Sequence, residues 1–283
     1  MFHWKPTTME LEAHKLSGLG NIIVIVDLIR QDGVIHQEQI LKIISEEQVS
    51  FDQLITIEPP EDPELHLKAR IFNTDGSEAK NCINGARCLA KYAIDSGLLP
   101  HEKFSVSTLG GIWNLQEASN GCYSAKISPP NFTLGRENLP QANFENIISL
   151  TTAKADIDIY FLNIGNPHAI CFVEDITNFP LPEVGAELQG SKWFPEGINF
   201  GIAKTLSPDI IELRVFERGV GETLACGSGA CAAVVAGNKL NLLNRSVEVR
   251  FKEGSLQVEY TKDTGELLAI GKANYINQLS LEI

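Results

Sequence analysis

The sequence contains one short pattern twice, around two cysteines that lie 144 positions apart. Residues 78–86 read EAKNCINGA and residues 222–230 read ETLACGSGA, so both segments fit Glu-x-x-x-Cys-x-x-Gly-Ala. A run of small, helix-forming residues follows each cysteine. This repeat predicts two related halves, in which Cys82 and Cys226 occupy equivalent turn-to-helix positions. Two thiols facing each other across a cleft suit chemistry that removes a proton from one face of a carbon and returns it to the other.

Length and composition narrow the class of protein. A chain of 283 residues is comfortable for two domains of about 140 residues each. A hydrophobic content of 43% and a charged content of 21% are ordinary for a soluble globular protein. The formal net charge of -13 argues against nucleic acid or an anionic membrane surface as a partner. No stretch approaches about 18 consecutive apolar residues, so no transmembrane helix is expected.

The N-terminus and the cysteine usage predict a cytoplasmic location. Residues 1–9 lack an apolar signal-peptide core and a small-residue cleavage site, and they read as a ragged extension in which Met9 is an alternative start. The six cysteines are sparse and include no Cys-x-x-Cys pair. A reduced cytoplasmic protein fits this usage better than a disulfide framework or a zinc site does.

Hydrophobic periodicity outlines the elements of the first half. The β-branched run at Asn21–Asp27 predicts a buried strand, and apolar residues at helical spacing predict a helix over Gln37–Gln48. Alternation predicts a strand at Leu65–Phe72, and Gly97 is placed to end a helix over residues 84–96. Short strands are then expected at Phe104–Thr108, Ile112–Gln116 and Cys122–Ile127.

The second half repeats this plan after a chain break at Ser128–Asn131. The weak signal from there to Ala155 predicts the crossover between the two domains. The helix expected around Gly229–Gly237 is small and apolar on every side, which predicts burial all round. Strands are expected at Ile159–Ile164, Ala169–Val173, Ile211–Phe216, Val247–Phe251, Leu256–Tyr260 and Leu267–Ile270.

Together these elements predict an α+β fold of two pseudosymmetric domains. The expected N-terminal domain comprises residues 1–127 plus 272–283 and carries Cys82. The expected C-terminal domain comprises residues 128–271 and carries Cys226.

The helix starts have a chemical consequence for both cysteines. A thiol has an ordinary pKa of about 8.5, and a helix N-terminus lowers that pKa. Free N–H groups at a helix N-terminus also bind anions, so two such termini can hold an α-carboxylate with its Cα between the two sulfurs. Four side chains are candidates for tuning the thiols and relaying protons: Glu78, His168, Glu217 and Glu222.

A structural interpretation stands beside this catalytic one. Free cysteine is among the most buried residue types, so a cysteine at a helix start is also compatible with a small core residue. The repeated pattern favours a catalytic role for Cys82 and Cys226. The remaining cysteines are expected to be core residues: Cys88, Cys122, Cys171 and Cys231.

Seven motifs stand along the chain in this order: Gly18-Leu-Gly-Asn21, Phe51-Asp-Gln53, Asn73-Thr-Asp-Gly-Ser-Glu78, Cys82-Ile-Asn-Gly85, Gly165-Asn166-Pro-His168, Asn199 and Glu217–Gly229. In these motifs and in their order the chain resembles the diaminopimelate epimerases, a family of cofactor-independent amino-acid racemases. The Glu217–Gly229 run is long and highly specific, whereas the Gly-Asn-Pro-His tetrad is moderately specific and Phe-Asp-Gln is weak.

The resemblance implies a fold and a reaction. Each domain would wrap a β-sheet around a central helix, with the active site at the domain interface. Cys82 and Cys226 would exchange the roles of base and acid, assisted by His168 and Glu217, to epimerise LL-2,6-diaminopimelate to meso-diaminopimelate for lysine and peptidoglycan precursor biosynthesis. The reaction would use no pyridoxal phosphate, other cofactor or metal.

The resemblance also implies binding residues and an assembly. The partner would be a small-molecule amino-acid substrate, and a homodimer is common in the family. The α-carboxylate would meet the N–H groups around Ile83, Asn84, Gly227 and Ser228. The other implied substrate-binding residues are Asn21, Gln53, Asn73, Asn166, Asn199 and Arg218.

Three positions depart from the family pattern, all in the first half. Ile83 stands where the family usually has glycine, and its β-branched side chain lies where the backbone is expected to approach the carboxylate. Ile22-Ile23 replaces the usual Asp-Phe after Asn21. Glu47–Ser50 replaces a segment that is usually rich in glycine.

Three alternative functions therefore stay open. The departures are compatible with a racemase that acts on another amino acid, such as a basic one. They are also compatible with a non-catalytic protein that binds an amino acid. A cysteine hydrolase that uses Cys226 with His168 is a further alternative, although it leaves Cys82 without a role.

Overall fold

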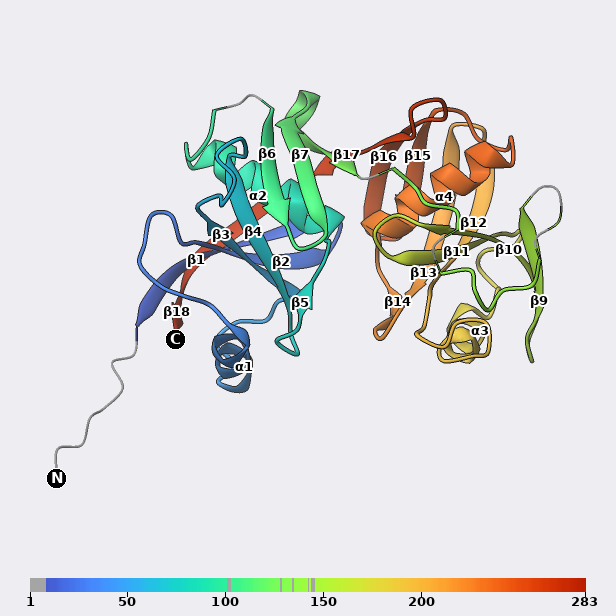
Figure 1. The fold of residues 1–283 in the computed structure, drawn as a ribbon, viewed down its shortest axis with the longest axis horizontal. Coiled ribbons are helices and arrows are strands. Elements are labelled where there is room, and N and C mark those ends of the chain that lie inside the picture. Colours follow the sequence, from blue (N-terminus) through green and yellow to red (C-terminus); the bar gives the residue numbers. More distant parts are fainter. Residues whose placement is uncertain (1–8, 101–102, 128, 134, 142, 144–145) are drawn as a thin grey trace. The chain divides into compact units, whose positions relative to one another are not determined.

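Figure 1 shows the computed structural model of the chain. The structure describes residues 9–283 except 101, 102, 128, 134, 142, 144 and 145. The expected N-terminal extension up to residue 8, and Ser128 in the expected chain break, lie outside the described residues. The chain forms two compact units, one with the residues up to Tyr123 and with Ala273–Ile283, the other with Ser124–Lys272.

The first unit is a mixed sheet around helix α2, Ile83–Asp95. The strands follow the order β18-β1-β2-β3-β4-β6-β7, in which β2–β3 and β4–β6 are parallel and the other neighbours are antiparallel. A short strand, β5, forms a hairpin with β4. The bounds are β1 Glu10–Gly18, β2 Asn21–Asp27, α1 Gln37–Ser45, β3 Gln53–Glu58, β4 Leu67–Asn73, β5 Glu78–Ala79, β6 Phe104–Thr108, β7 Gly111–Glu117, a 3-10 turn Ser119–Gly121 and β18 Asn274–Glu282.

The second unit is a mixed sheet around helix α4, Gly227–Lys239. The strands follow the order β9-β10-β11-β12-β13-β15-β16-β17-β8, in which β11–β12 and β13–β15 are parallel. A short strand, β14, forms a hairpin with β13. The bounds are β8 Cys122–Ile127, β9 Ile147–Thr151, β10 Asp156–Asn163, β11 Pro167–Phe172, α3 Leu181–Leu188, β12 Asn199–Ser207, β13 Ile210–Glu217, β14 Gly221–Thr223, β15 Ser246–Phe251, β16 Gly254–Thr261 and β17 Glu266–Lys272.

The two units follow one plan, element by element (Figure 1). Each has a parallel strand pair that encloses a short helix, β2-α1-β3 and β11-α3-β12. Each then has an antiparallel strand, a short hairpin and a central helix of 13 residues. The strand after each central helix pairs in parallel with the strand before the hairpin. The α+β fold and the pseudosymmetry predicted from the repeated cysteine pattern are confirmed.

Both central helices are buried because the sheets curl around them. Helix α2 packs against β1, β2, β3, β7 and β18, which lie at both ends and in the middle of the strand order. Helix α4 packs against β10 to β13 and β15 to β17. Every residue of α4 from Gly229 to Gly237 is buried, as its all-round apolar sequence predicts. The side chains of that segment are all small, which lets the strands approach the helix closely.

A second core lies on the other face of each sheet, beneath a short helix. In the first unit Ile40 and Ile43 of α1 pack with Val24 and Val26 of β2. In the second unit Leu181, Val184 and Leu188 of α3 pack with residues of β10 to β12. Each unit is therefore a sheet between two helical layers, and apolar residues on both faces explain the continuous apolar run of β2.

The structure corrects two expected boundaries. Helix α1 ends at Ser45 rather than at Gln48, because Glu47 takes a left-handed backbone conformation with φ 51. The segment from the expected break to Ala155 is part of the second unit and not a simple crossover. Within it, Asn131 bridges to Asn163, and β9 pairs with β10.

Several elements have no counterpart in the sequence prediction, namely β1, β3, β12, β18, α3 and the short strands β5, β9 and β14. Strand β18 shows why, because its residues are mostly exposed and its apolar and polar positions alternate only over the last four residues. None of the helices in the described ranges is long and apolar enough to cross a membrane.

Candidate functional site

Cys82 begins α2 in the position that caps its N-terminus. Its Sγ accepts a hydrogen bond from the N–H of Gly85 at 3.1 Å, and Oδ1 of Asn21 lies 3.9 Å from the same sulfur. Gly85 is needed there, since a Cβ would lie 2.6 Å from Cδ1 of Ile55 and 3.1 Å from the Cys82 sulfur. The N–H groups of Ile83 and Asn84 belong to the first turn, where a helix offers no internal partner. This half-site combines a thiol with anion-binding backbone donors.

Cys226 begins α4 in the same way. Its Sγ accepts from the N–H of Gly229 at 3.3 Å, and a Cβ on Gly229 would lie 2.8 Å from Cγ2 of Val215. Gly227 and Ser228 provide the first N–H groups of this helix. The prediction that both cysteines stand at helix starts is confirmed, and the two half-sites have the same backbone geometry.

A carboxylate and a hydroxyl surround the Cys226 thiol. Cys226 donates to Oε2 of Glu217 at 3.2 Å, and the Ser228 hydroxyl lies 3.4 Å from the sulfur. The Thr223 hydroxyl donates to the other Glu217 oxygen, which fixes the carboxylate. Burial raises the pKa of the Cys226 thiol well above its usual range, and the negative charge of Glu217 raises that pKa further. At neutral pH the sulfur therefore keeps its proton and can serve as an acid.

His168 lies fully buried behind this thiol and joins it through two other side chains. Its Nε2 lies 3.1 Å from Oδ1 of Asn166, and Nδ2 of Asn166 lies 3.5 Å from the Ser228 hydroxyl. Burial lowers the pKa of His168 to about 3, and the positive charge of Arg218 adds to the shift. The imidazole is therefore neutral, and its Nε2–H donates to Asn166.

The neutral His168 predicts a specific loss of stability in acid. The unfolded chain binds a proton below pH about 6.5, whereas the folded histidine, with a pKa of about 3, does not. Stability from this site is full above about pH 6.5 and falls by about 1.4 kcal/mol per pH unit as the pH drops towards 3. Urea unfolding at pH 7, 6, 5 and 4 gives the free energy of unfolding of the wild type and of His168→Gln as a function of pH. The wild-type curve is expected to fall more steeply, and parallel curves would contradict a neutral buried histidine.

The two glutamates of the repeated pattern form ion pairs with arginines. Glu78 pairs with Arg70 at 2.9 Å, and Glu222 pairs with Arg214 at 2.7 Å. Each pair joins the two strands of the hairpin that precedes a cysteine. The expectation that Glu78 and Glu222 relay protons is therefore replaced by a structural role, because their carboxylates are held by arginines of β4 and β13.

The predicted polar binding residues divide into two kinds. The Asn199 side chain is committed to the backbone, since its Nδ2 donates to the Pro167 carbonyl and its Oδ1 accepts from the Arg218 N–H, both at 3.1 Å. In the first unit Gln53 donates to Oδ1 of Asn73 at 2.9 Å, and Nδ2 of Asn73 donates to the Ser77 hydroxyl. The side-chain amides of Asn199 and Asn73 thus have hydrogen-bond partners within the protein at both polar atoms. Arg218, by contrast, is exposed at the end of β13.

The departures from the family pattern mostly lie in the core. Ile22 packs on the α1 side of the first sheet, and its N–H donates to the Asp52 carboxylate at 2.6 Å. Ile23 is fully buried. Ile83 is 4% exposed as the first residue of α2. The pair Ile22-Ile23 therefore changes packing, whereas Ile83 adjoins the Cys82 thiol directly in sequence.

Two contributing residues escaped the sequence analysis. Thr223 orients Glu217, and Arg87 is fully buried in α2 with its guanidinium on the Asn84 side chain. The signal for Arg87 was a charged residue inside an otherwise buried helix, which is rare unless the charge has partners. No comparable signal marked Thr223.

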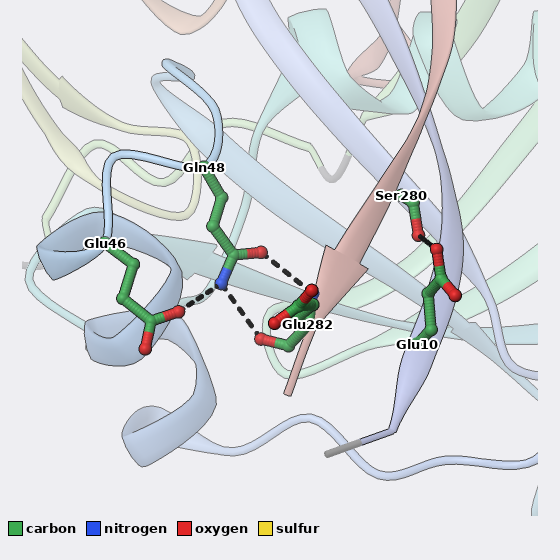
Figure 2. A pocket seen from close by; sticks show the side chains of 5 residues that line it. All are labelled: Glu10, Glu46, Gln48, Ser280 and Glu282. Carbon is green, nitrogen blue, oxygen red and sulfur yellow. Dashed lines mark hydrogen bonds between the residues drawn. The ribbon is translucent and has the colours of Figure 1, made fainter.

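The first unit also has a surface hollow away from the predicted residues. Figure 2 shows its lining, which is Glu10, Glu46, Gln48, Ser280 and Glu282. The Gln48 amide exchanges two hydrogen bonds with the Glu282 backbone and covers the outer edge of β18 there. Three carboxylates line this hollow, so it does not suit a substrate carboxylate. Among the described residues, no group of His, Cys, Asp and Glu is arranged to hold a metal ion.

Most of the chain matches the sequence model of a known protein family. A model of the family described as diaminopimelate epimerase matches residues 13–131 and 160–276. A curated diaminopimelate epimerase from Acinetobacter baumannii (strain AYE) is 39% identical over 254 residues, which cover 89% of this chain and 90% of that protein. One from Acinetobacter baylyi (strain ATCC 33305 / BD413 / ADP1) is 38% identical with the same coverage.

Solved structures confirm the fold at low sequence identity. A hydroxyproline epimerase from Agrobacterium vitis superposes with a TM-score of 0.73 at 13% identity, covering 100% of this chain and 94% of that one. A probable proline racemase from Agrobacterium radiobacter K84 gives a TM-score of 0.71 at 11% identity, covering 95% and 92%. These neighbours share the two-domain α+β architecture predicted from the sequence.

Proposed function

Because the chain belongs to the diaminopimelate epimerase family and is an isomerase, we propose that it converts LL-2,6-diaminopimelate to meso-diaminopimelate with two cysteines and no pyridoxal phosphate or metal. The observation that carries the proposal is the matched pair of thiols, each capping a central helix of 13 residues. The curated relatives named diaminopimelate epimerase support the choice of substrate.

The chemistry follows from the half-sites. The first-turn N–H groups of α2 and α4 bind the α-carboxylate, so that the Cα–H bond faces one sulfur and the opposite face of Cα faces the other. A thiolate takes the α-proton, so a C–H bond breaks and an S–H bond forms. The electron pair left on Cα spreads into the carboxylate held by the N–H donors. The second thiol gives its proton to the opposite face, which inverts the centre and leaves that sulfur as a thiolate.

Each catalytic group has a defined task in this proposal. Cys226 starts as the acid for the LL substrate because burial and Glu217 keep its proton in place, and Cys82 starts as the base. The roles exchange for the meso substrate. Glu217 accepts the Cys226 S–H in the resting state, and His168 supports Ser228 through Asn166. His168 therefore acts as a neutral scaffold rather than as the proton carrier.

The distal end of the substrate needs polar groups, since it carries an amino and a carboxyl group. We propose Asn21, Asn73, Asn166 and Arg218 as its contacts, with Arg218 bound to the distal carboxylate. Gln53 holds the Asn73 amide, and Asn199 holds the backbone at Pro167 and Arg218, so both also support these contacts. The two units then serve as the two epimerase domains, and the enzyme works as a cytoplasmic homodimer in lysine and peptidoglycan precursor biosynthesis.

A single experiment tests the reaction and its substrate. Purified protein is incubated with LL-diaminopimelate in deuterated water. The products are separated by chiral chromatography, and their deuterium content is measured by mass spectrometry. The proposal predicts the meso isomer with one deuterium at the inverted α-carbon. The absence of both the meso isomer and the α-deuterium would reject this substrate.

One observation keeps a second substrate in view. Ile83 is a β-branched residue directly after Cys82, at a position where the family usually has glycine. A racemase for another amino acid, such as a basic one, would show α-deuteration of that amino acid in a panel of L-amino acids. A non-catalytic binding protein would show ligand-induced thermal stabilisation without any α-deuterium.

The cysteine hydrolase alternative has less support. Its nucleophile and base would need to lie within hydrogen-bond reach of each other. In the described second unit, Cys226 donates to Glu217, and His168 is hydrogen-bonded to Asn166 instead. Its low pKa also makes His168 a weak base.

A further inference from the structure

We propose that Arg87 is a positioning residue that orients the Asn84 side chain, so that its NH2 group donates to the α-carboxylate of the substrate. The inference deepens the proposed function and rests on it. It adds a side-chain donor to the backbone N–H groups of the Cys82 half-site.

The contacts of Arg87 point back to the start of its own helix. Nη2 donates to Oδ1 of Asn84 at 2.8 Å, and Nη1 donates to the Ile83 carbonyl at 3.2 Å. The whole side chain is buried, with 0% exposure. Burying a guanidinium costs free energy, and a helix N-terminus is an unfavourable place for a cation. These two costs make Arg87 a candidate for a role in the site beyond its own packing.

The contact with Arg87 determines which way the Asn84 amide points. A guanidinium has donors and no acceptor, so the atom of Asn84 that faces it must be the oxygen. The Asn84 NH2 group is then directed away from Arg87 with two donors. Asn84 is the second residue of α2, in the turn whose N–H groups bind anions. The Asn84 side chain therefore adds its NH2 group to this set of donors. If the amide were flipped, it would present its oxygen to the substrate carboxylate, which would repel it.

The second unit shows that the helix does not require an arginine. Helix α4 has the same length, and its cysteine caps it in the same way. Five residues after that cysteine it has Cys231, fully buried, where α2 has Arg87. Two residues after the cysteine it has Ser228 where α2 has Asn84. Arginine and asparagine thus occur together in one half-site and are both replaced in the other, which fits a joint role.

The experiment is a double-mutant cycle on the epimerase reaction. Arg87→Met removes the donors and keeps an apolar side chain, a replacement that buried charges often tolerate. It is expected to raise KM about tenfold, with kcat within about threefold and no loss of thermal stability. Arg87→Lys keeps a charge and a donor and is expected to recover part of the KM. Asn84→Ser copies the second unit, and adding Arg87→Met to it is expected to change KM by less than about twofold.

The control and the contrary outcomes separate positioning from packing. Cys88→Ala alters the adjacent, fully buried position and is expected to leave KM unchanged. The inference is overturned if Arg87→Met leaves KM unchanged, if its effect adds in full to that of Asn84→Ser, or if it lowers only the thermal midpoint. The wild-type deuterium exchange decides the proposed function separately. If the wild type exchanges another amino acid, the cycle is run with that one. If it exchanges none, the LL-diaminopimelate concentration that gives half-maximal thermal stabilisation replaces KM.

Discussion

Cys226→Ala is expected to lower the rate of epimerisation by about 10³- to 10⁴-fold, because the substrate then loses the acid on one face of its α-carbon. The measurement is chiral chromatography of the products from LL-diaminopimelate. The proposed base on the other face, Cys82, is unchanged in this variant, so it can still remove the α-proton and return a deuteron to the same face. In deuterated water the LL substrate is therefore expected to gain α-deuterium faster than it is converted to the meso isomer.

Cys231→Ala is the matched control, since Cys231 lies in the same helix and is fully buried. It loses the same sulfur from the same element and is expected to keep epimerisation within about twofold while it costs some stability. Equal losses of activity in the two variants would mean that Cys226 acts through packing. A Cys226→Ala variant that still epimerises rapidly would reject the two-cysteine mechanism.

Glu217→Gln is expected to lower kcat about 10²-fold and to make the Cys226 thiol ionise at lower pH. The carboxylate raises the pKa of Cys226 by its charge, so a neutral amide in its place lowers that pKa. The rate of iodoacetamide alkylation, followed by mass spectrometry of the peptide that contains Cys226, is measured between pH 6 and 11. Its rise with pH is expected to shift to lower pH in the variant.

Glu222→Gln is the matched control, because it makes the same charge change on the strand that pairs with the end of β13. Glu222 pairs with Arg214 and is held away from the sulfur, so kcat within about threefold of wild type and an unshifted alkylation profile are expected. If Glu217→Gln leaves the alkylation profile where it was, the carboxylate does not control the thiol. If the profile shifts without any loss of kcat, Glu217 tunes Cys226 but does not take part in turnover.

Local signals in the sequence were sufficient for the main features of the fold. The β-branched run of β2 and the small-residue helix α4 are continuous patterns whose burial follows from their own composition. Both cysteines stand at helix starts, and in each helix the third and fourth residues are glycine and alanine. Edge strand β18 was missed, since it is mostly exposed and alternates only over its last four residues, and β9 was missed within a segment of weak signal.

These local sequence patterns did not predict which side chain each charged residue contacts. Glu78, Glu217 and Glu222 are equivalent candidates in the sequence, yet it is Glu217 that accepts a hydrogen bond from the Cys226 thiol. The other two lie opposite arginines across a hairpin, and strand pairing decides that contact. Arg87 and Asn199 show the same limit, because a buried polar side chain takes whichever donor or acceptor the packed structure places beside it.

The sequence by itself determined that the chain has two equivalent halves, each presenting a thiol at the start of a buried helix, because both features follow from short-range residue patterns. The tertiary structure alone decided how the halves differ, with a carboxylate on Cys226 and a buried guanidinium behind Asn84 in the half that carries Cys82. The physical reason is that hydrogen bonds and desolvation act between residues brought together by strand pairing and packing, and no spacing in the chain encodes their orientation.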